Sequence, residues 1–142
     1  MQVYIICSKR WVSRVNKNDS SPAFLNSNIE NNLSTVDLMI RTMNFSLSDV
    51  YLIGGYHIEK LVKRFSGLKF LYEDKWTSKN WSFCQEIFNK ANKEEILFIS
   101  SEIIFNDPFV KLLKSKLKQK RSFICTVNKN NIDELEKKTV FI

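Results

Sequence analysis

A strand, a helix and a second strand follow one another in residues 50–72, VYLIGGYHIEKLVKRFSGLKFLY. Residues 50–53 are apolar and rich in residue types that favour strands, and two glycines close the run. In residues 57–65 the apolar side chains return every three or four positions, which is the period of a helix. Residues 68–72 form another apolar run. This order predicts a βαβ unit, and the two strands of such a unit are parallel.

The same alternation extends in both directions along the chain. Further strands are predicted at 3–7, 96–99 and 122–127, further helices at 36–43, 80–92 and 107–117, and the start of a last strand at 139–142. Strands that alternate with helices of this length predict an α/β fold of three layers, Rossmann-like, with a mostly parallel central sheet and helices on both faces. We expect one domain over residues 1–142, since this is the usual length of a single domain.

Composition narrows the classes of protein to consider. The chain has 44% apolar residues, 3 cysteines, 1 histidine and a net charge of +7. The cysteines are widely spaced and odd in number, which favours reduced thiols in a cytoplasmic compartment, and no zinc motif is present. No apolar run approaches the roughly 20 residues that span a bilayer, and the first strand has no basic leader, so we expect no membrane association and no signal peptide.

Much of the positive charge falls in residues 111–121, KLLKSKLKQKR. Such a stretch is typical either of the solvated face of a helix or of a surface for an anionic partner such as nucleic acid. We favour the solvated face, because no known nucleic-acid motif and no interleaved aromatic residues accompany the lysines.

Ligands of parallel sheets bind beyond the carboxyl ends of the strands. The candidate site therefore comes from the segments after four predicted strands. They are residues 8–28, 54–56, 73–80 and 100–106.

These segments contain motif-like residues in a fixed order. They include ICSKRWVSRV (6–15), YLIGGYHIE (51–59), YE (72–73) followed by NWS (80–82), and ILFISSEIIF (96–105). In this order they resemble the nucleotidyltransferases that activate sugar phosphates or phosphocholine. That family opens with a strand, a glycine-rich loop that ends in Arg, and then Pro-Lys and Leu; Arg14, Pro22 and Leu25 fall on its Arg, Pro and Leu.

The resemblance implies a function and a set of site residues. The chain would bind a nucleoside triphosphate with Mg²⁺ and transfer its nucleotidyl group to a phosphorylated small molecule, namely a sugar phosphate or phosphocholine. Arg14 and Lys9 would be the catalytic cations that face the phosphates. The implied nucleotide contacts are Ser8, Arg10, Gly55, Asn80 and Ser82, and the implied Mg²⁺ ligands are Glu102 and Asp107.

The chain also departs from the family pattern. Arg10 and Val12 replace both loop glycines, Ala23 replaces the lysine, and Glu102 replaces the metal-binding aspartate. The sequence also stops where the family begins its second half, so we expect either a fragment or a domain without an acceptor site. Two functions stay open, a divergent nucleotidyltransferase and an inactive relative that serves as a binding or scaffold domain; nucleic-acid binding through 111–121 ranks third. The sequence does not predict the oligomeric state.

Overall fold

A computed structural model of the chain describes residues 1–8, 10–12, 20–22, 33–75, 82–90, 95–103, 107–119, 124–127 and 138–141. Its strands are β1 (Gln2–Ile6), β2 (Arg10–Val12), β3 (Ser20–Pro22), β4 (Val50–Gly54), β5 (Lys69–Tyr72), β6 (Ile96–Ser100), β7 (Ile124–Val127) and β8 (Lys138–Phe141). Its helices are α1 (Thr35–Met43), the short 3₁₀ helix η2 (Leu47–Asp49), α2 (Ile58–Arg64), α3 (Ser82–Lys90) and α4 (Asp107–Lys118).

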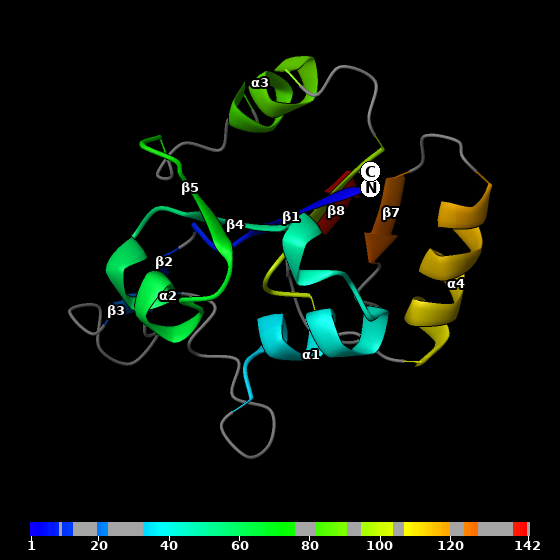
Figure 1. Cartoon of the computed structure of the whole chain (residues 1–142), viewed down its shortest axis with the longest axis horizontal. Helices are drawn as coiled ribbons and strands as arrows, with labels where there is room; N and C mark the ends of the chain where they lie inside the picture. Colours follow the sequence, from blue (N-terminus) through cyan, green and yellow to red (C-terminus); the bar gives the residue numbers. More distant parts are fainter. Residues whose placement is uncertain are drawn as a thin grey trace.

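Four parallel strands form the central sheet, in the order β5-β4-β1-β6 (Figure 1). The strands are the apolar runs that the sequence predicts, because strands covered on both faces must be apolar throughout. This confirms the α/β prediction; residues 3–7, 50–53 and 96–99 are buried, apart from the half-buried Tyr51 and Ile96. Although β6 ends the strand order, Leu97, Phe98 and Ile99 are buried, and β8 contacts β6.

Helices cover both faces of the sheet, which makes three layers. Val3, Ile5 and Cys7 point to the face covered by α1, α2 and α4, where they form the larger core cluster. Tyr4 and Ile6 point to the opposite face, where α3 covers them in a second cluster. Figure 1 shows α3 above the sheet and α1 and α2 below it. Right-handed crossovers account for α1 and α2 on one face and α3 on the other, because the chain reverses its direction across the sheet between β5 and β6.

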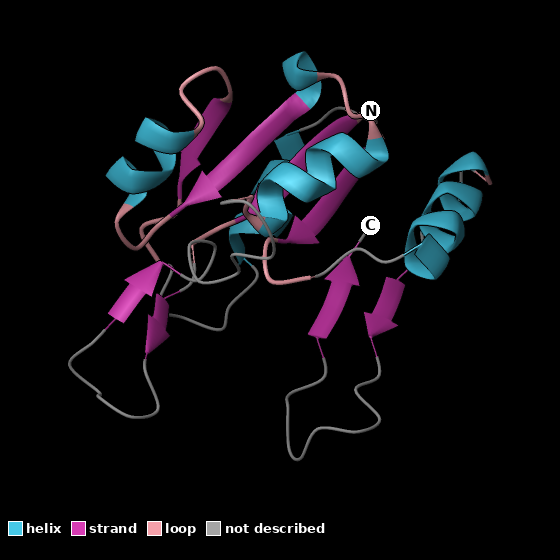
Figure 2. Cartoon of the chain, turned by 90° about the horizontal axis from the view of Figure 1, so that it is seen from below, coloured by secondary structure: helices cyan, strands magenta, loops and turns pink. Residues whose placement is uncertain are grey.

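Two predicted segments turn out differently. The prediction that 122–127 continues the parallel alternation is wrong, because β7 pairs antiparallel with β8 in a separate two-stranded sheet (Figure 2). The segment after β1 contains the antiparallel pair β2–β3, for which the sequence predicts no strand. Short antiparallel pairs of this kind depend on the register with a partner strand, and the period of one strand alone does not reveal it. No helix in the described ranges is long and apolar enough to cross a membrane.

Candidate functional site

The carboxyl edge of the sheet contains a topological switch point. From β1 the chain moves outward to β4 and then to β5, and it returns across the sheet to β6 on the other side of β1. The strand order therefore reverses between β1 and β6, and the carboxyl edge at such a reversal is the usual place for ligands of open parallel sheets. Ile6 is in register with both Ile53 and Ser100, so the three central strands end at the same level.

Backbone hydrogen bonds join the strand ends along this edge. The N–H of Cys7 donates to the carbonyl of Ile53 (2.8 Å), and the N–H of Ser101 donates to the carbonyl of Ile6 (3.0 Å). The N–H of Tyr56 donates to the carbonyl of Ser8 at 3.2 Å. The structure thus brings together the segments that contain Ser8, Gly55 and Glu102, three of the residues that the family resemblance implies.

Small polar side chains form the floor of the switch point. Ser8, Ser100 and Ser101 are buried, with 3%, 8% and 1% of their surface exposed. The hydroxyl of Thr35, at the start of α1, donates to the carbonyl of Ser101. These contacts fix the turn after β6 against β1 and α1, so Glu102 leaves the sheet from a rigid position.

Cys7 is buried next to Ser101. Burial raises the pKa of its thiol to about 12, and a hydrogen bond with Ser101 opposes this only in part. Since the thiolate is the reactive form, this shift disfavours a nucleophilic role for Cys7 at neutral pH. Cys84 on α3 behaves alike, because partial burial and the nearby charge of Glu73 raise its pKa to about 12.

Arg10 places a cation near the carboxyl edge of the sheet. Its guanidinium lies 5.3 Å from the centre of the Tyr56 ring, which is a cation–π contact. The ring of His57 packs edge-on against the ring of Tyr56, and the two ring centres are 4.3 Å apart. His57 Nδ1 is 2.6 Å from Glu59 Oε1, so the stack continues into the first turn of α2. Arg10 itself is exposed, which leaves the guanidinium accessible from solvent.

The remaining implied site residues are only partly placed. Lys9, Arg14 and Asn80 lie outside the described residues, and of Ser82 only the backbone, at the start of α3, is described. Glu102 is half-buried, and its N–H donates to Ser100 Oγ at 3.4 Å. Asp107 is exposed in the first turn of α4, and the segment between it and Glu102 includes residues outside the described ranges.

The described residues contain no group of three or more His, Cys, Asp or Glu side chains that would hold a metal by themselves. Mg²⁺ does not need such a group, because it commonly binds through one or two carboxylates and the phosphates of a nucleotide. Glu102 and Asp107 each carry the hard carboxylate oxygens that this ion prefers.

Sequence reasoning missed two features of this edge. One is the stack of Arg10 on Tyr56, which no local pattern indicates because the two residues are far apart in the chain. The other is the burial of Glu73, which belongs to the quoted pair YE but has no role assigned from the sequence; it is only 9% exposed directly after β5, and its N–H donates to the carbonyl of Gly54 at 2.8 Å. A charged residue directly after an apolar strand is a usable signal for this second feature.

Comparisons of the chain with protein-family models, with curated proteins and with solved structures gave no match.

Proposed function

We propose that this domain is a divergent relative of the nucleotidyltransferases, and that it binds a nucleoside triphosphate with Mg²⁺ at the switch point between β1 and β6. One observation supports the proposal above the others. The strand order reverses between β1 and β6, and a hydrogen bond from the N–H of Ser101 to the carbonyl of Ile6 holds the ends of these two strands together. The carboxyl edge at such a reversal is the usual ligand site of open parallel sheets.

The charges at this edge of the sheet favour a phosphorylated ligand. Arg10 follows β1 and its guanidinium lies over Tyr56, just beyond the end of β4; a guanidinium matches phosphate oxygens in charge and geometry. Glu102 follows β6 and would approach the phosphates only through a cation. A cation and a carboxylate at the same edge thus favour a nucleotide that carries Mg²⁺ over a neutral metabolite.

The proposed chemistry is transfer of a nucleotidyl group to a sugar phosphate or phosphocholine, with release of pyrophosphate. Such transfer depends mostly on positioning and on neutralising phosphate charge. In this chain Arg10 would neutralise charge on the triphosphate, Glu102 and Asp107 would hold the metal ion, and the buried serines would keep both turns rigid.

The test is calorimetric titration of the chain with CTP, UTP, GTP and ATP, each with and without Mg²⁺. We expect at least one nucleotide to bind, and Mg²⁺ to strengthen its binding. Glu102→Gln should remove the effect of Mg²⁺. The matched control is Glu95→Gln, because Glu95 is an exposed glutamate directly before β6, at the opposite end of the same strand.

A second pair of variants tests the cation. Arg10→Gln should weaken nucleotide binding about tenfold, since a charge-assisted hydrogen bond is lost. Arg41→Gln, in the exposed last turn of α1, should leave binding unchanged. The proposal fails if no triphosphate binds, or if each variant behaves like its control.

The inactive relative is the second candidate, and the contact of Arg10 favours it. The family has glycine at this position, where the bare backbone approaches the phosphates. Here a large side chain takes its place and lies against Tyr56. Binding without turnover would distinguish this candidate from an active transferase.

A further inference from the structure

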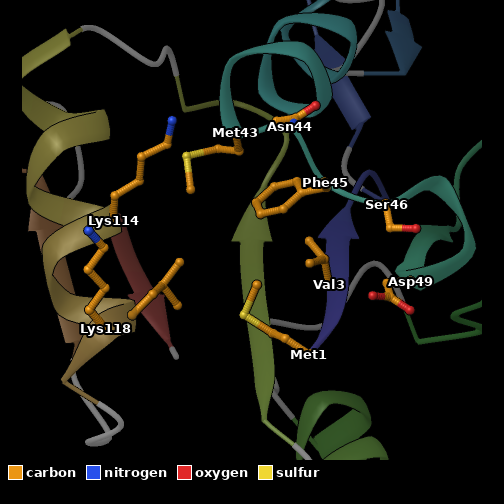
Figure 3. A pocket seen from close by; sticks show the side chains of 10 residues that line it. Met1, Val3, Met43, Asn44, Phe45, Ser46, Asp49, Lys114 and Lys118 are labelled. Atoms are coloured by element: carbon orange, nitrogen blue, oxygen red, sulfur yellow. The ribbon is translucent and has the colours of Figure 1, made fainter.

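A cavity of about 350 Å³ lies at the amino end of the sheet, opposite the edge described above. Its walls come from the start of β1, the end of α1, the segment that follows it, and α4. Figure 3 shows Met1, Val3 and Phe45 across its middle, with Lys114 and Lys118 on one side and Asp49 on the other. Nothing in the proposed nucleotide function uses this cavity.

The apolar floor follows from the way in which α1 ends. Asn44 takes a left-handed conformation, with φ of 54°, and its N–H donates to the carbonyl of Arg41 at 3.2 Å. This cap stops the helix and turns the chain, so that Phe45 lies beside Val3. Met43, Val3 and Leu117 complete an apolar surface on which a hydrocarbon or aromatic group would lose its contact with water.

Two lysines form the charged wall. Lys114 and Lys118 are one helical turn apart on α4, so their ammonium groups lie on the same face of the helix. Lys114 Nζ donates to the carbonyl of Thr42 at 3.3 Å, which holds this side chain over the end of α1. A partly ordered lysine loses less side-chain entropy when it binds an anion.

The size and charge of the cavity define the ligand. An apolar cavity of about 150 Å³ is enough for benzene in another protein, so roughly twice that volume accepts a molecule of about ten heavy atoms. Lys114 and Lys118 face Asp49 across the cavity floor. This arrangement favours a ligand with a single negative charge, placed at the lysine end. Asp49 at the far end repels a second negative charge.

We propose that this cavity binds a small apolar carboxylate, with its hydrocarbon body on the floor and its carboxylate against Lys114 and Lys118. The inference also gives a role to part of the basic stretch 111–121, which the nucleotide proposal leaves aside. It does not depend on that proposal, because the two sites lie at opposite ends of the sheet and have separate readouts.

The experiment compares three probes that share one hydrocarbon chain: octanoate, octanol and octylammonium. NMR spectra of the full chain, labelled at the methionine methyl groups, report on Met1 and Met43 within the cavity. We expect saturable shifts at these methyl groups, with octanoate binding about tenfold more tightly than octanol and octylammonium binding most weakly.

Variants then test the lysines. The double variant Lys114→Gln/Lys118→Gln should bind octanoate and octanol alike, whereas Lys111→Gln, an exposed lysine on the same helix that does not line the cavity, should keep the preference. Asp49→Asn should strengthen octanoate binding a few-fold. Since these side chains lie at the surface or the cavity rim, the variants are expected to fold, and their thermal unfolding verifies this.

Three results would overturn the proposal. The first is equal affinity of the unaltered chain for octanoate and octanol, and the second is an unchanged preference in the double lysine variant. The third is self-association, seen by sedimentation, that shifts the same methyl groups and that octanoate does not reverse, since a second copy of the chain would then occupy the cavity.

Discussion

Gly54 ends strand β4 at a place without room for a side chain. A Cβ atom built there would lie 2.5 Å from Cγ1 and 2.7 Å from Cδ1 of Ile58, which is far inside normal contact. We expect Gly54→Ala to destabilise the fold by about 1–3 kcal/mol, because α2 must shift to relieve the overlap. Urea unfolding followed by circular dichroism measures this change.

Gly67 is the matched control for this prediction. It precedes β5, and a Cβ atom there would meet nothing within 4 Å. Gly67→Ala should therefore be neutral, or stabilise the protein by up to about 1 kcal/mol through the unfolded chain. Equal destabilisation by both substitutions would show that loss of glycine, and not the contact with Ile58, is responsible.

Positive φ angles occur at residues that the sequence does not single out. Among the described residues they belong to Asn44 and His57, with φ of 54° and 53°, and to no glycine. Asn44 could have been predicted, since asparagine is a known substitute for glycine at helix ends. His57 could not, because histidine carries no comparable signal; its ring contacts Tyr56 and Glu59, and such contacts arise only in the folded chain.

Helix α1 begins with a reciprocal capping arrangement. The N–H of Asp37 donates to Ser34 Oγ at 3.3 Å, and the N–H of Ser34 donates to Asp37 Oδ2 at 2.9 Å. We expect Ser34→Ala to lower the free energy of unfolding by about 1 kcal/mol, since loss of the Ser34 hydroxyl leaves one helix N–H without its acceptor. Thermal or urea unfolding tests this expectation.

Ser46→Ala is the control for the cap. Ser46 precedes the short helix η2 in the same way, but its side chain makes no capping hydrogen bond. The substitution should change stability by less than about 0.5 kcal/mol, as surface changes usually do. If it costs as much as Ser34→Ala, the capping account of α1 is wrong.

Asp37 also links α1 to α2 and makes this link depend on pH. Arg64 Nη2 donates to Asp37 Oδ2 at 3.0 Å. Burial raises the pKa of this carboxyl, but hydrogen bonds from Ser34 and Arg64 outweigh it, so the pKa lies below its usual value. The folded chain therefore takes up this proton later than the unfolded chain as the pH falls.

The sign of the pH effect follows from this order. The stabilisation by Asp37 is complete above the unfolded pKa and is lost as the pH falls through the lower folded pKa. We expect unaltered protein to be more stable than Asp37→Asn at pH 7, with a difference that shrinks below about pH 5. Asp74→Asn, in the exposed turn after β5, serves as the control. A difference that grows toward acid pH would contradict the prediction.

Most elements could be predicted from the sequence, because buried strands and amphipathic helices leave strong periods. The predicted strand 96–99 matches β6, which extends one residue further, and the predicted helix 107–117 matches α4, which also extends one residue further. The strands whose pairing the sequence did not predict have one feature in common. β2, β3, β7 and β8 are stabilised by antiparallel partners, and a strand of three or four residues shows too few positions for its pairing to be predicted.

At the scale of the whole molecule, the sequence predicts a parallel sheet but not its strand order. Alternation fixes the handedness of each crossover, whereas the step from β5 back across the sheet to β6 depends on which edge of β1 offers the better apolar contact. The position of the candidate site depends on this step, since the switch point lies between β1 and β6. For this reason the sequence could nominate Ser8, Gly55 and Glu102 but could not show how the segments that contain them are joined along one edge of the sheet.

At this scale, the proposed function predicts binding without efficient turnover. The sheet keeps the switch point, but Arg10 and Val12 carry Cβ atoms where the family has bare backbone, so phosphates cannot approach the N–H groups as closely. One missing donor at developing charge costs about 2.7–4 kcal/mol, or 10²–10³ in rate. Ala23 in place of the family's lysine removes a further cation.

Arg10 offers only partial compensation. Its guanidinium is at the end of a long, exposed side chain, whereas the family uses fixed backbone N–H groups, so ordering this side chain around the phosphates costs conformational entropy. We therefore expect no measurable pyrophosphate release from CTP, UTP, GTP or ATP in the presence of Mg²⁺ and either phosphocholine or common sugar 1-phosphates. The decisive contrary result would be turnover that Glu102→Gln abolishes and Glu95→Gln preserves. Such turnover would mean that the substituted loop places its donors by another route, and that the chain is an active transferase in spite of its lost glycines.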